Sequence, residues 1–307
     1  MKLSEIGEFG LIERLKELLN SSIIGDDTAP LSVGNTTVLL TCDILVQDRH
    51  FKLSYPASAI GWKAISVNVS DVVANGGLPK YALVSLVLPD MELKYVEELY
   101  EGIKKACEFY GCEVVGGNVS GGERLIVDVF MLGQAERFVG RRSARVGETV
   151  FVSGTLGDAR AGLELLLMEK RSYEDFELRL IERHLRPTAR IDLARHVSKY
   201  ASASMDISDG LSSDALKMAK ASGVAIKLYS EKVPVSLELR EFCKRHGKDP
   251  LEYALAGGED YELLFTHVFE RLNPFLSMIP VGVVIEGEGL YLDEIPVEPK
   301  GFDHFRL

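Results

Sequence analysis

The sequence predicts an α/β (α+β) protein with about two domains. The chain has 307 residues, which suits two domains of roughly 150 residues each. Almost purely apolar runs at residues 81–88 and 125–132 are typical of buried strands, and the amphipathic segment 92–110, closed by Gly111, is typical of a capped helix. A boundary within 134–139 predicts an N-terminal α/β domain of residues 1–137 and a C-terminal α/β domain of residues 138–307.

The composition narrows the classes of function. A formal net charge of −11 argues against a nucleic-acid-binding protein, which would carry a basic face. No run of about 18 apolar residues could span a membrane, and the N-terminus lacks the apolar stretch of a signal peptide. The four cysteines show neither a CxxC motif nor zinc-finger spacing. We therefore expect a cytoplasmic protein with reduced thiols and without nucleic-acid or membrane partners.

In the first half of the chain, candidate ligands lie at the ends of short elements. An amphipathic helix is expected at 8–19, a polar turn at 25–30 (GDDTAP), and a strand at 38–40 that runs into Thr41, Cys42 and Asp43. An aspartate after an apolar strand is a common ligand position, but it is also a common loop start. His50, a little further on, is at least as often a structural histidine as a ligand.

The most informative stretch is residues 66–79, SVNVSDVVANGGLP. It continues an apolar-periodic run after Pro56, and a pair of glycines ends the helix. Asn68, Asp71 and Asn75 fall on one face of this helix, at i, i+3 and i+7. A solvated face normally carries Lys and Glu, whereas Asn and Asp are poor helix formers. The stripe therefore suggests a metal or phosphate site, with a solvated face as the alternative.

Glycine-rich and acidic turns continue this pattern. A strand at 113–115 breaks into GGNVSGG (116–122), which is either a loop that approaches phosphate or a tight turn before the next strand. In the second half we expect strands at 149–153, 224–229 and 281–285 and helices at 162–168, 176–184 and 191–200. A short strand delivers Asp206, and Ser208 and Asp209 lie where the next helix starts. Two carboxylates that bracket a serine fit a metal–phosphate site better than an ordinary helix cap.

Six aspartates at the ends of predicted elements, at positions 26, 27, 43, 71, 206 and 209, could converge on one site. Hard oxygen ligands of this kind suit Mg²⁺, which bridges protein carboxylates to phosphates. Arg142 would supply a fixed cation for the phosphates. The commonest nucleotide, hydrolase and zinc motifs (GxxxxGK[ST], GxGxxG, GxSxG and HExxH) are absent from the sequence.

Taken together, these segments resemble the thiamine-monophosphate kinase family of the aminoimidazole-ribonucleotide synthetase-like superfamily. The motifs are GDDTAP, TCD…HF, NVSDVVANGG, GGN, GRR, MDISDGLSSD and GGEDYELLF, and they follow one another over nearly the whole chain. The resemblance implies a two-domain fold whose N-terminal sheets pair across a homodimer. It also implies direct in-line transfer of a phosphoryl group from ATP to thiamine monophosphate, with several Mg²⁺ ions and no general base.

The resemblance also assigns site residues, with Asp43 and Asp71 the most critical. The positions that match Mg²⁺ ligands are Asp26, Thr41, Cys42, Asp43, Asp71, Asn118, Asp206 and Asp209. Those that match ATP contacts are Tyr100, Gly117, Asn118, Arg142 and Ser208. Those that match the thiamine-phosphate site are His50, Glu259 and Phe302.

Three positions depart from the family pattern. Asn118 stands where Asp is common, which weakens the case for a metal ligand there. Cys42 stands where a hydroxyl residue is frequent, so its contact to Mg²⁺ would be through the backbone carbonyl. Phe302 stands where Trp often occurs, and it keeps a stacking face with less area.

The alternatives come from the same superfamily and from a different class of protein. One is a selenophosphate or aminoimidazole-ribonucleotide synthetase; selenophosphate synthetases carry a reactive Cys or selenocysteine in an N-terminal loop, and residues 1–25 contain no cysteine. The other is a nucleotide-binding maturation or scaffold protein, which would not need the paired acids of GDD and TCD. The simplest alternative is an α/β protein with acidic turns and no site.

Overall fold

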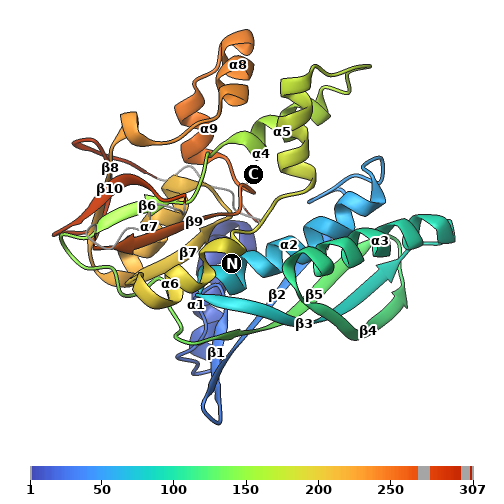
Figure 1. Cartoon of the computed structure of the whole chain (residues 1–307), viewed down its shortest axis with the longest axis horizontal. Coiled ribbons are helices and arrows are strands. Elements are labelled where there is room, and N and C mark those ends of the chain that lie inside the picture. The colour runs from blue at the N-terminus through green and yellow to red at the C-terminus, as the bar shows by residue number, and fades with distance from the viewer. Residues whose placement is uncertain (1, 269–276, 299–304, 306–307) are drawn as a thin grey trace.

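Two sheets built from successive parts of the chain contact one long central helix (Figure 1). The computed structural model describes residues 2–268, 277–298 and 305. The elements of the first part are α1 (Leu3–Leu18), β1 (Ala29–Val33), β2 (Thr36–Val46), α2 (Ala57–Ala74), β3 (Gly77–Leu88), α3 (Leu93–Tyr110), β4 (Glu113–Gly121) and β5 (Ile126–Ala135). They form a five-stranded sheet of order β1-β2-β5-β3-β4, in which only β3 and β4 pair in parallel.

The second part forms a seven-stranded sheet of order β12-β11-β8-β10-β6-β9-β7. Its strands are β6 (Thr149–Val152), β7 (Ala203–Ile207), β8 (Ala225–Leu228), β9 (Glu262–His267), β10 (Ile279–Ile285), β11 (Gly289–Leu292) and β12 (Ile295–Pro296). Its helices are α4 (Asp158–Leu167), α5 (Asp175–Leu185), η1 (Ile191–Leu193), α6 (Ala194–Tyr200), α7 (Leu211–Ser222), η2 (Ser230–Lys232), α8 (Leu237–His246) and α9 (Pro250–Ala256). Helices α4, α5, α8 and α9 contact one another and occupy the upper part of Figure 1.

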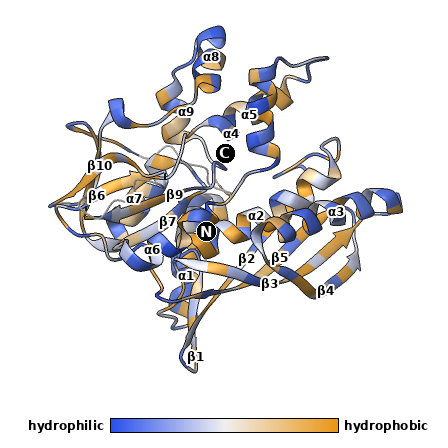
Figure 2. Cartoon of the chain, in the orientation of Figure 1, coloured by the Kyte–Doolittle hydropathy of each residue, from blue (hydrophilic) through white to orange (hydrophobic). Residues whose placement is uncertain are grey.

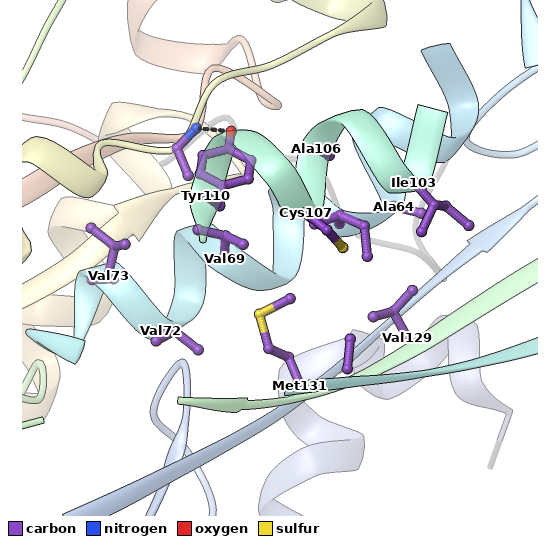
Figure 3. Packing of buried hydrophobic residues seen from close by; sticks show 14 of the residues in the cluster. Ala64, Val69, Val72, Val73, Ile103, Ala106, Cys107, Tyr110, Val129 and Met131 are labelled. Atoms are coloured by element: carbon purple, nitrogen blue, oxygen red, sulfur yellow. Dashed lines mark hydrogen bonds between the residues drawn. The ribbon is translucent and has the colours of Figure 1, made fainter. Parts of the chain in front are cut away.

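Helix α2 is the centre of the molecule. One core cluster runs from the N-terminal sheet through α2 to Phe151 and Phe265 of the second sheet. Helix α3 can lie directly against α2 because glycines stand at the crossing: a β-carbon at Gly61 would lie 2.0 Å from the Leu99 carbonyl oxygen, and one at Gly102 1.9 Å from that of Ser58. Figure 3 shows apolar side chains of α2 and α3 meeting those of β5, among them Ala64, Val69, Val72, Ile103, Cys107, Val129 and Met131.

The structure confirms the α/β class and corrects several local expectations. The strand expected to be buried at 81–88 has an open face, because Tyr81 is 50% exposed and Leu83 is 41% exposed. The expected loop 116–122 is mostly strand β4, which pairs with β3 along its length. The strand expected at 38–40 spans eleven residues as β2. Side-chain exposure alternates along β5, so this strand is not equally buried on both faces.

Hydrophobic residues concentrate on the strands of both sheets, whereas α8 is largely hydrophilic (Figure 2). Sequence reasoning had assigned neither α8 nor α9, although each has a local start signal: Ser236 accepts a hydrogen bond from the Leu239 amide, and Pro250 occupies the first turn of α9. Within the described residues, no helix combines the length and the apolar character needed to cross a membrane.

Candidate active site

Three carboxylates from distant parts of the chain meet at the C-terminal half of α2. Asp27 comes from the loop before β1, Asp71 from α2 and Asp206 from β7, and one carboxylate oxygen of each lies within 4.8 Å of the others. We call these three residues the acid trio. Asp206 is buried because every residue of β7 is buried, whereas Asp71 is partly buried on α2, which contacts both sheets.

The acid trio carries unbalanced negative charge. Two unit charges at such a separation repel each other by roughly 3.5 kcal/mol at an effective dielectric constant of about 20. Burial, reinforced by neighbouring carboxylates, raises the pKa of Asp71 and of Asp206 well above the ordinary range. Burial also raises the pKa of Asp27 to about 6, although the nearby Arg141 opposes the shift. Simultaneous ionisation of the three carboxylates is therefore unfavourable, because they repel one another.

The donor set fits Mg²⁺. Asp27 Oδ2 is buried and accepts no hydrogen bond from any described residue, so one oxygen is left without a partner. Hydrogen bonds orient the other two carboxylates: Thr41 Oγ1 donates to Asp71 Oδ2, and Ser70 Oγ donates to Asp206 Oδ2 at 2.7 Å. Several convergent carboxylate oxygens with an unsatisfied atom are what a hard divalent cation requires.

The two asparagines of the α2 stripe hold neighbouring backbone segments in place, Asn68 a strand and Asn75 two loops. Asn75 Oδ1 accepts hydrogen bonds from Thr28 N (2.8 Å) and Thr28 Oγ1 (2.7 Å), and its amide donates to the Val139 carbonyl at 2.9 Å. Asn68 Oδ1 accepts from the Asp43 amide at 3.0 Å. Both asparagines are fully buried. The polar face predicted from sequence therefore combines one member of the acid trio with two supporting amides.

The two aspartates of the GDD turn make different contacts. Asp26 accepts hydrogen bonds from the Arg141 backbone amide (3.2 Å) and from Asn75 Nδ2 (3.3 Å), whereas the Arg141 guanidinium lies against Asp27. Asp27, and not Asp26, contributes an oxygen to the acid trio. Adjacent aspartates in a turn carry no local signal that distinguishes the two: both are among the six aspartates expected to converge, and the family match names Asp26 alone.

Strand β2 brings two of its predicted residues to the α2 side and turns one away. Thr41 contacts Asp71, and after burial Asp43 is the strongest influence on the pKa of Asp71. Cys42 lies on the opposite, exposed face, where its Sγ is 3.2 Å from Asp128 Oδ1.

Asp209 and Glu259 have cationic partners that sequence reasoning did not identify. Lys217 Nζ lies 2.5 Å from Asp209 Oδ2. Lys63 Nζ lies 2.6 Å from Glu259 Oε1. Asp209 is not part of the acid trio, although it directly follows Ser208 in the loop after β7.

Other predicted residues lie apart from the trio within one chain. Gly117 and Asn118 are exposed on β4, which is separated from β2 by β5 and β3, a distance of roughly 14 Å at ordinary strand spacing. Tyr100 is 37% exposed on α3. His50 Nδ1 accepts a hydrogen bond from the Val46 amide at 2.9 Å. Phe302 lies outside the described residues.

A cationic cavity of about 510 Å³ adjoins Asp26. Arg142 lines it and donates to the Ile24 carbonyl at 3.1 Å. Three further cations line the same cavity, in an otherwise acidic protein: Arg137, Arg145 and Lys199. A cavity of this charge beside a carboxylate cluster suits a polyphosphate.

Known proteins match the whole chain. Residues 25–135 match the family model of the AIR synthase related protein N-terminal domain, and residues 145–272 match that of its C-terminal domain. The thiamine-monophosphate kinase of Aquifex aeolicus is 62% identical over 306 residues, covering 99% of this chain and 100% of the relative. The thiamine-monophosphate kinase of Bacillus subtilis is 36% identical, covering 97% of this chain and 99% of the relative.

Solved structures agree with the sequence match. The complex described as AaThiL with AMPPCP and TMP has a TM-score of 0.98 and 62% identity, and the match covers 99% of each chain. Hydrogenase maturation protein HypE in complex with ATP shares the fold alone, with a TM-score of 0.68 and 18% identity over 93% of this chain and 90% of that one. The family predicted from the sequence is thus confirmed. The chain belongs to the thiamine-monophosphate kinase family of AIR synthase related proteins.

Proposed function

We propose that this chain phosphorylates thiamine monophosphate to thiamine diphosphate, with ATP as the donor and ADP as the second product. The observation that carries the proposal is the acid trio with a buried, unpartnered oxygen on Asp27. The relatives support it, because they are named for this activity and one was solved with AMPPCP and TMP. Since ATP is the donor, we place the reaction in the cytoplasm.

The proposed chemistry is a single in-line transfer. A phosphate oxygen of thiamine monophosphate attacks the γ-phosphorus of ATP, and the bond from that phosphorus to the β–γ bridging oxygen breaks to release ADP. The attacking phosphate is already ionised at neutral pH, so we assign no side chain as a general base. Base catalysis typically contributes about 10²- to 10⁴-fold, whereas the larger barrier here is the repulsion between two polyanions.

We propose that the acid trio is the centre of a Mg²⁺ site, with Asp43 and Asp71 the most critical carboxylates. Bound Mg²⁺ would neutralise phosphate charge and align the reacting oxygens. Thr41 and Ser70 orient two of the trio carboxylates through their hydrogen bonds. The remaining candidate ligands are those of the family match: Asp26, Cys42 through its carbonyl, Asn118 and Asp209.

The substrates are proposed to lie on either side of this centre. The cationic cavity supports a role for Arg142 in binding ATP phosphates. We assign further ATP contacts to Tyr100, Gly117, Asn118 and Ser208, and thiamine monophosphate contacts to His50, Glu259 and Phe302.

We also propose a homodimer formed through the N-terminal sheet. Helix α2 covers one face of this sheet, and the other face exposes large apolar side chains: Leu31, Val33, Ile44, Tyr81, Leu83 and Val115. An apolar sheet face of this kind is typical of a protein–protein interface. Because β4 is distant from the acid trio of its own chain, we propose that Asn118 serves the site across this interface.

The test is an assay with ATP, thiamine monophosphate and Mg²⁺, in which products are separated by chromatography. We expect one ADP for each thiamine diphosphate formed, and no product without thiamine monophosphate. ATP-dependent stabilisation without thiamine diphosphate would instead indicate another acceptor or a scaffold role, and the next step would then be a screen of acceptors.

A further inference from the structure

Glu259 is held between two buried side chains that belong to different elements. Lys63 Nζ of α2 lies 2.6 Å from Glu259 Oε1, and His184 Nδ1 of α5 lies 3.1 Å from Oε2. The side chains of Lys63 and His184 are only 4% and 2% exposed, whereas that of Glu259 is 26% exposed. The two partners are therefore buried, whereas the Glu259 side chain that they contact remains partly exposed.

The backbone at Glu259 requires such support. Glu259 has φ of +66° and Tyr261 has φ of +51°, a left-handed conformation that side chains with a β-carbon rarely adopt. The segment is fixed to the loop after β7, because the Glu259 amide donates to the Ser208 carbonyl at 2.8 Å and the Tyr261 amide to the Ile207 carbonyl at 3.0 Å. The glutamate is thus set in place by backbone and side chain together.

The charge state follows from the same contacts. Burial alone would raise the pKa of Glu259, but Lys63 and His184 outweigh it and hold this pKa well below the ordinary glutamate range. Burial and the charge of Lys63 lower the pKa of His184, so its imidazole is neutral, and its Nδ1 lies 3.1 Å from Glu259 Oε2. Glu259 is therefore an ionised group that only accepts hydrogen bonds.

The distance from the acid trio suits a substrate with a phosphate at one end. Lys63 and Ser70 are seven residues apart on the same face of α2, and Ser70 hydrogen-bonds Asp206 of the trio. Seven residues correspond to about 10 Å along a helix. Thiamine monophosphate has its phosphate at one end and its aminopyrimidine at the other, and the exocyclic amine is its N–H donor.

We propose that Lys63 and His184 are positioning residues that hold the Glu259 carboxylate as the acceptor for the exocyclic amine of thiamine monophosphate. This inference rests on the proposed function and adds to it the carboxylate that recognises the aminopyrimidine ring of the substrate. Each carboxylate oxygen keeps a lone pair beyond the one directed at Lys63 or His184, so the exposed side of Glu259 can still accept from the substrate.

The first test is Lys63→Met, with Lys94→Met as the matched control, since Lys94 forms an exposed ion pair with Glu98 on α3. We expect Lys63→Met to raise the KM for thiamine monophosphate about 10- to 100-fold, the size typical of a lost hydrogen bond to a charged group. The KM for ATP should stay within about twofold of wild type in both variants. Lys63→Arg should recover part of the loss.

Two further measurements separate positioning from a purely structural role. In a Glu259→Gln background, Lys63→Met should have little additional effect on KM, because both act through one carboxylate. Wild type should discriminate against the analogue of thiamine monophosphate that lacks the exocyclic amine, and Lys63→Met should reduce that discrimination. If Lys63→Met does not fold, His184→Gln provides the second variant for the same measurements.

The outcomes are distinct. Wild type that forms no thiamine diphosphate would overturn the proposed function itself. Active wild type with an unchanged KM in folded Lys63→Met, or with equal turnover of the deaminated analogue, would overturn this inference alone. Additive effects of Lys63→Met and Glu259→Gln would also overturn it, because they would show that Lys63 does not act through Glu259.

Discussion

Replacing Asp71 by Asn is expected to separate stability from activity. Asn has nearly the same shape and keeps an oxygen that can accept the hydrogen bond from Thr41. The substitution removes one charge from the acid trio, in which each carboxylate oxygen lies within 4.8 Å of the other two. Without a metal ion, that charge only repels its neighbours.

The magnitude follows from Coulomb's law. Each ionised pair in the trio costs roughly 3.5 kcal/mol at an effective dielectric constant of about 20. Partial protonation already relieves some of this repulsion at neutral pH, so we expect Asp71→Asn to stabilise the metal-free protein by about 1–3 kcal/mol. When a cation is bound among the carboxylates, Asp71→Asn instead removes an attraction between that cation and the lost charge. This attraction is roughly 3.5 kcal/mol or more, by the same Coulomb estimate, and corresponds to about 300-fold or more in turnover.

The assay pairs chemical denaturation in EDTA with turnover of thiamine monophosphate in Mg²⁺. Asp90→Asn is the matched control, since Asp90 is exposed in the loop before α3 and loses the same charge. Asp71→Asn should be more stable than wild type in EDTA and nearly inactive in Mg²⁺, and Asp90→Asn should match wild type in both. A folded Asp71→Asn enzyme with near-normal turnover would refute the reasoning.

Three other predictions concern the surroundings of the trio and the sheet face. Arg141→Leu leaves the carboxylate of Asp27 buried without its cation and should lower the free energy of unfolding by about 3–5 kcal/mol in denaturant titrations; an unchanged midpoint would contradict this. Because the raised pKa of Asp206 makes the folded protein bind protons more tightly than the unfolded chain, metal-free stability should fall as pH rises above about 4, and Mg²⁺ should raise Tm more at pH 8 than at pH 5.5. An equal Mg²⁺ effect at both pH values would count against metal binding at the trio. Leu83→Arg, on a residue of the open sheet face that is 41% exposed, should shift the sedimenting species from dimer to monomer, and a wild-type monomer would rule out the proposed homodimer.

Local patterns predicted the elements that carry strong local signals. Helix α3 ends at Gly111 in the left-handed conformation expected of a C-cap, and α2 ends before the glycine pair that marked its end in the sequence. The start of β4 at residues 113–115 is predicted as a strand, but residues 116–122 are predicted as a loop because their glycines indicate turns locally. The pairing of β4 with β3, which is formed by residues distant in the sequence, overrides that local preference.

In the candidate site, too, local patterns predicted some residues, whereas long-range contacts determine the others. The polar stripe on α2 pointed to Asp71, but which aspartate of GDD would face it depends on where Arg141 folds back, and no local pattern encodes that contact. Lys63 was missed for a similar reason. A lysine among apolar helix positions suggests an exposed side chain, and its partner Glu259 lies far along the chain on a different domain.

The path of the γ-phosphoryl group itself can be followed with a radioactive label. Wild type stripped with EDTA is mixed with [γ-³²P]ATP and thiamine monophosphate, with or without added Mg²⁺, and quenched at short times. We expect label in the terminal phosphate of thiamine diphosphate as fast as ADP forms, only when Mg²⁺ is restored, and never on the protein. Labelled protein that precedes product, or ADP formed with free phosphate and unchanged thiamine monophosphate, would contradict direct transfer to thiamine monophosphate.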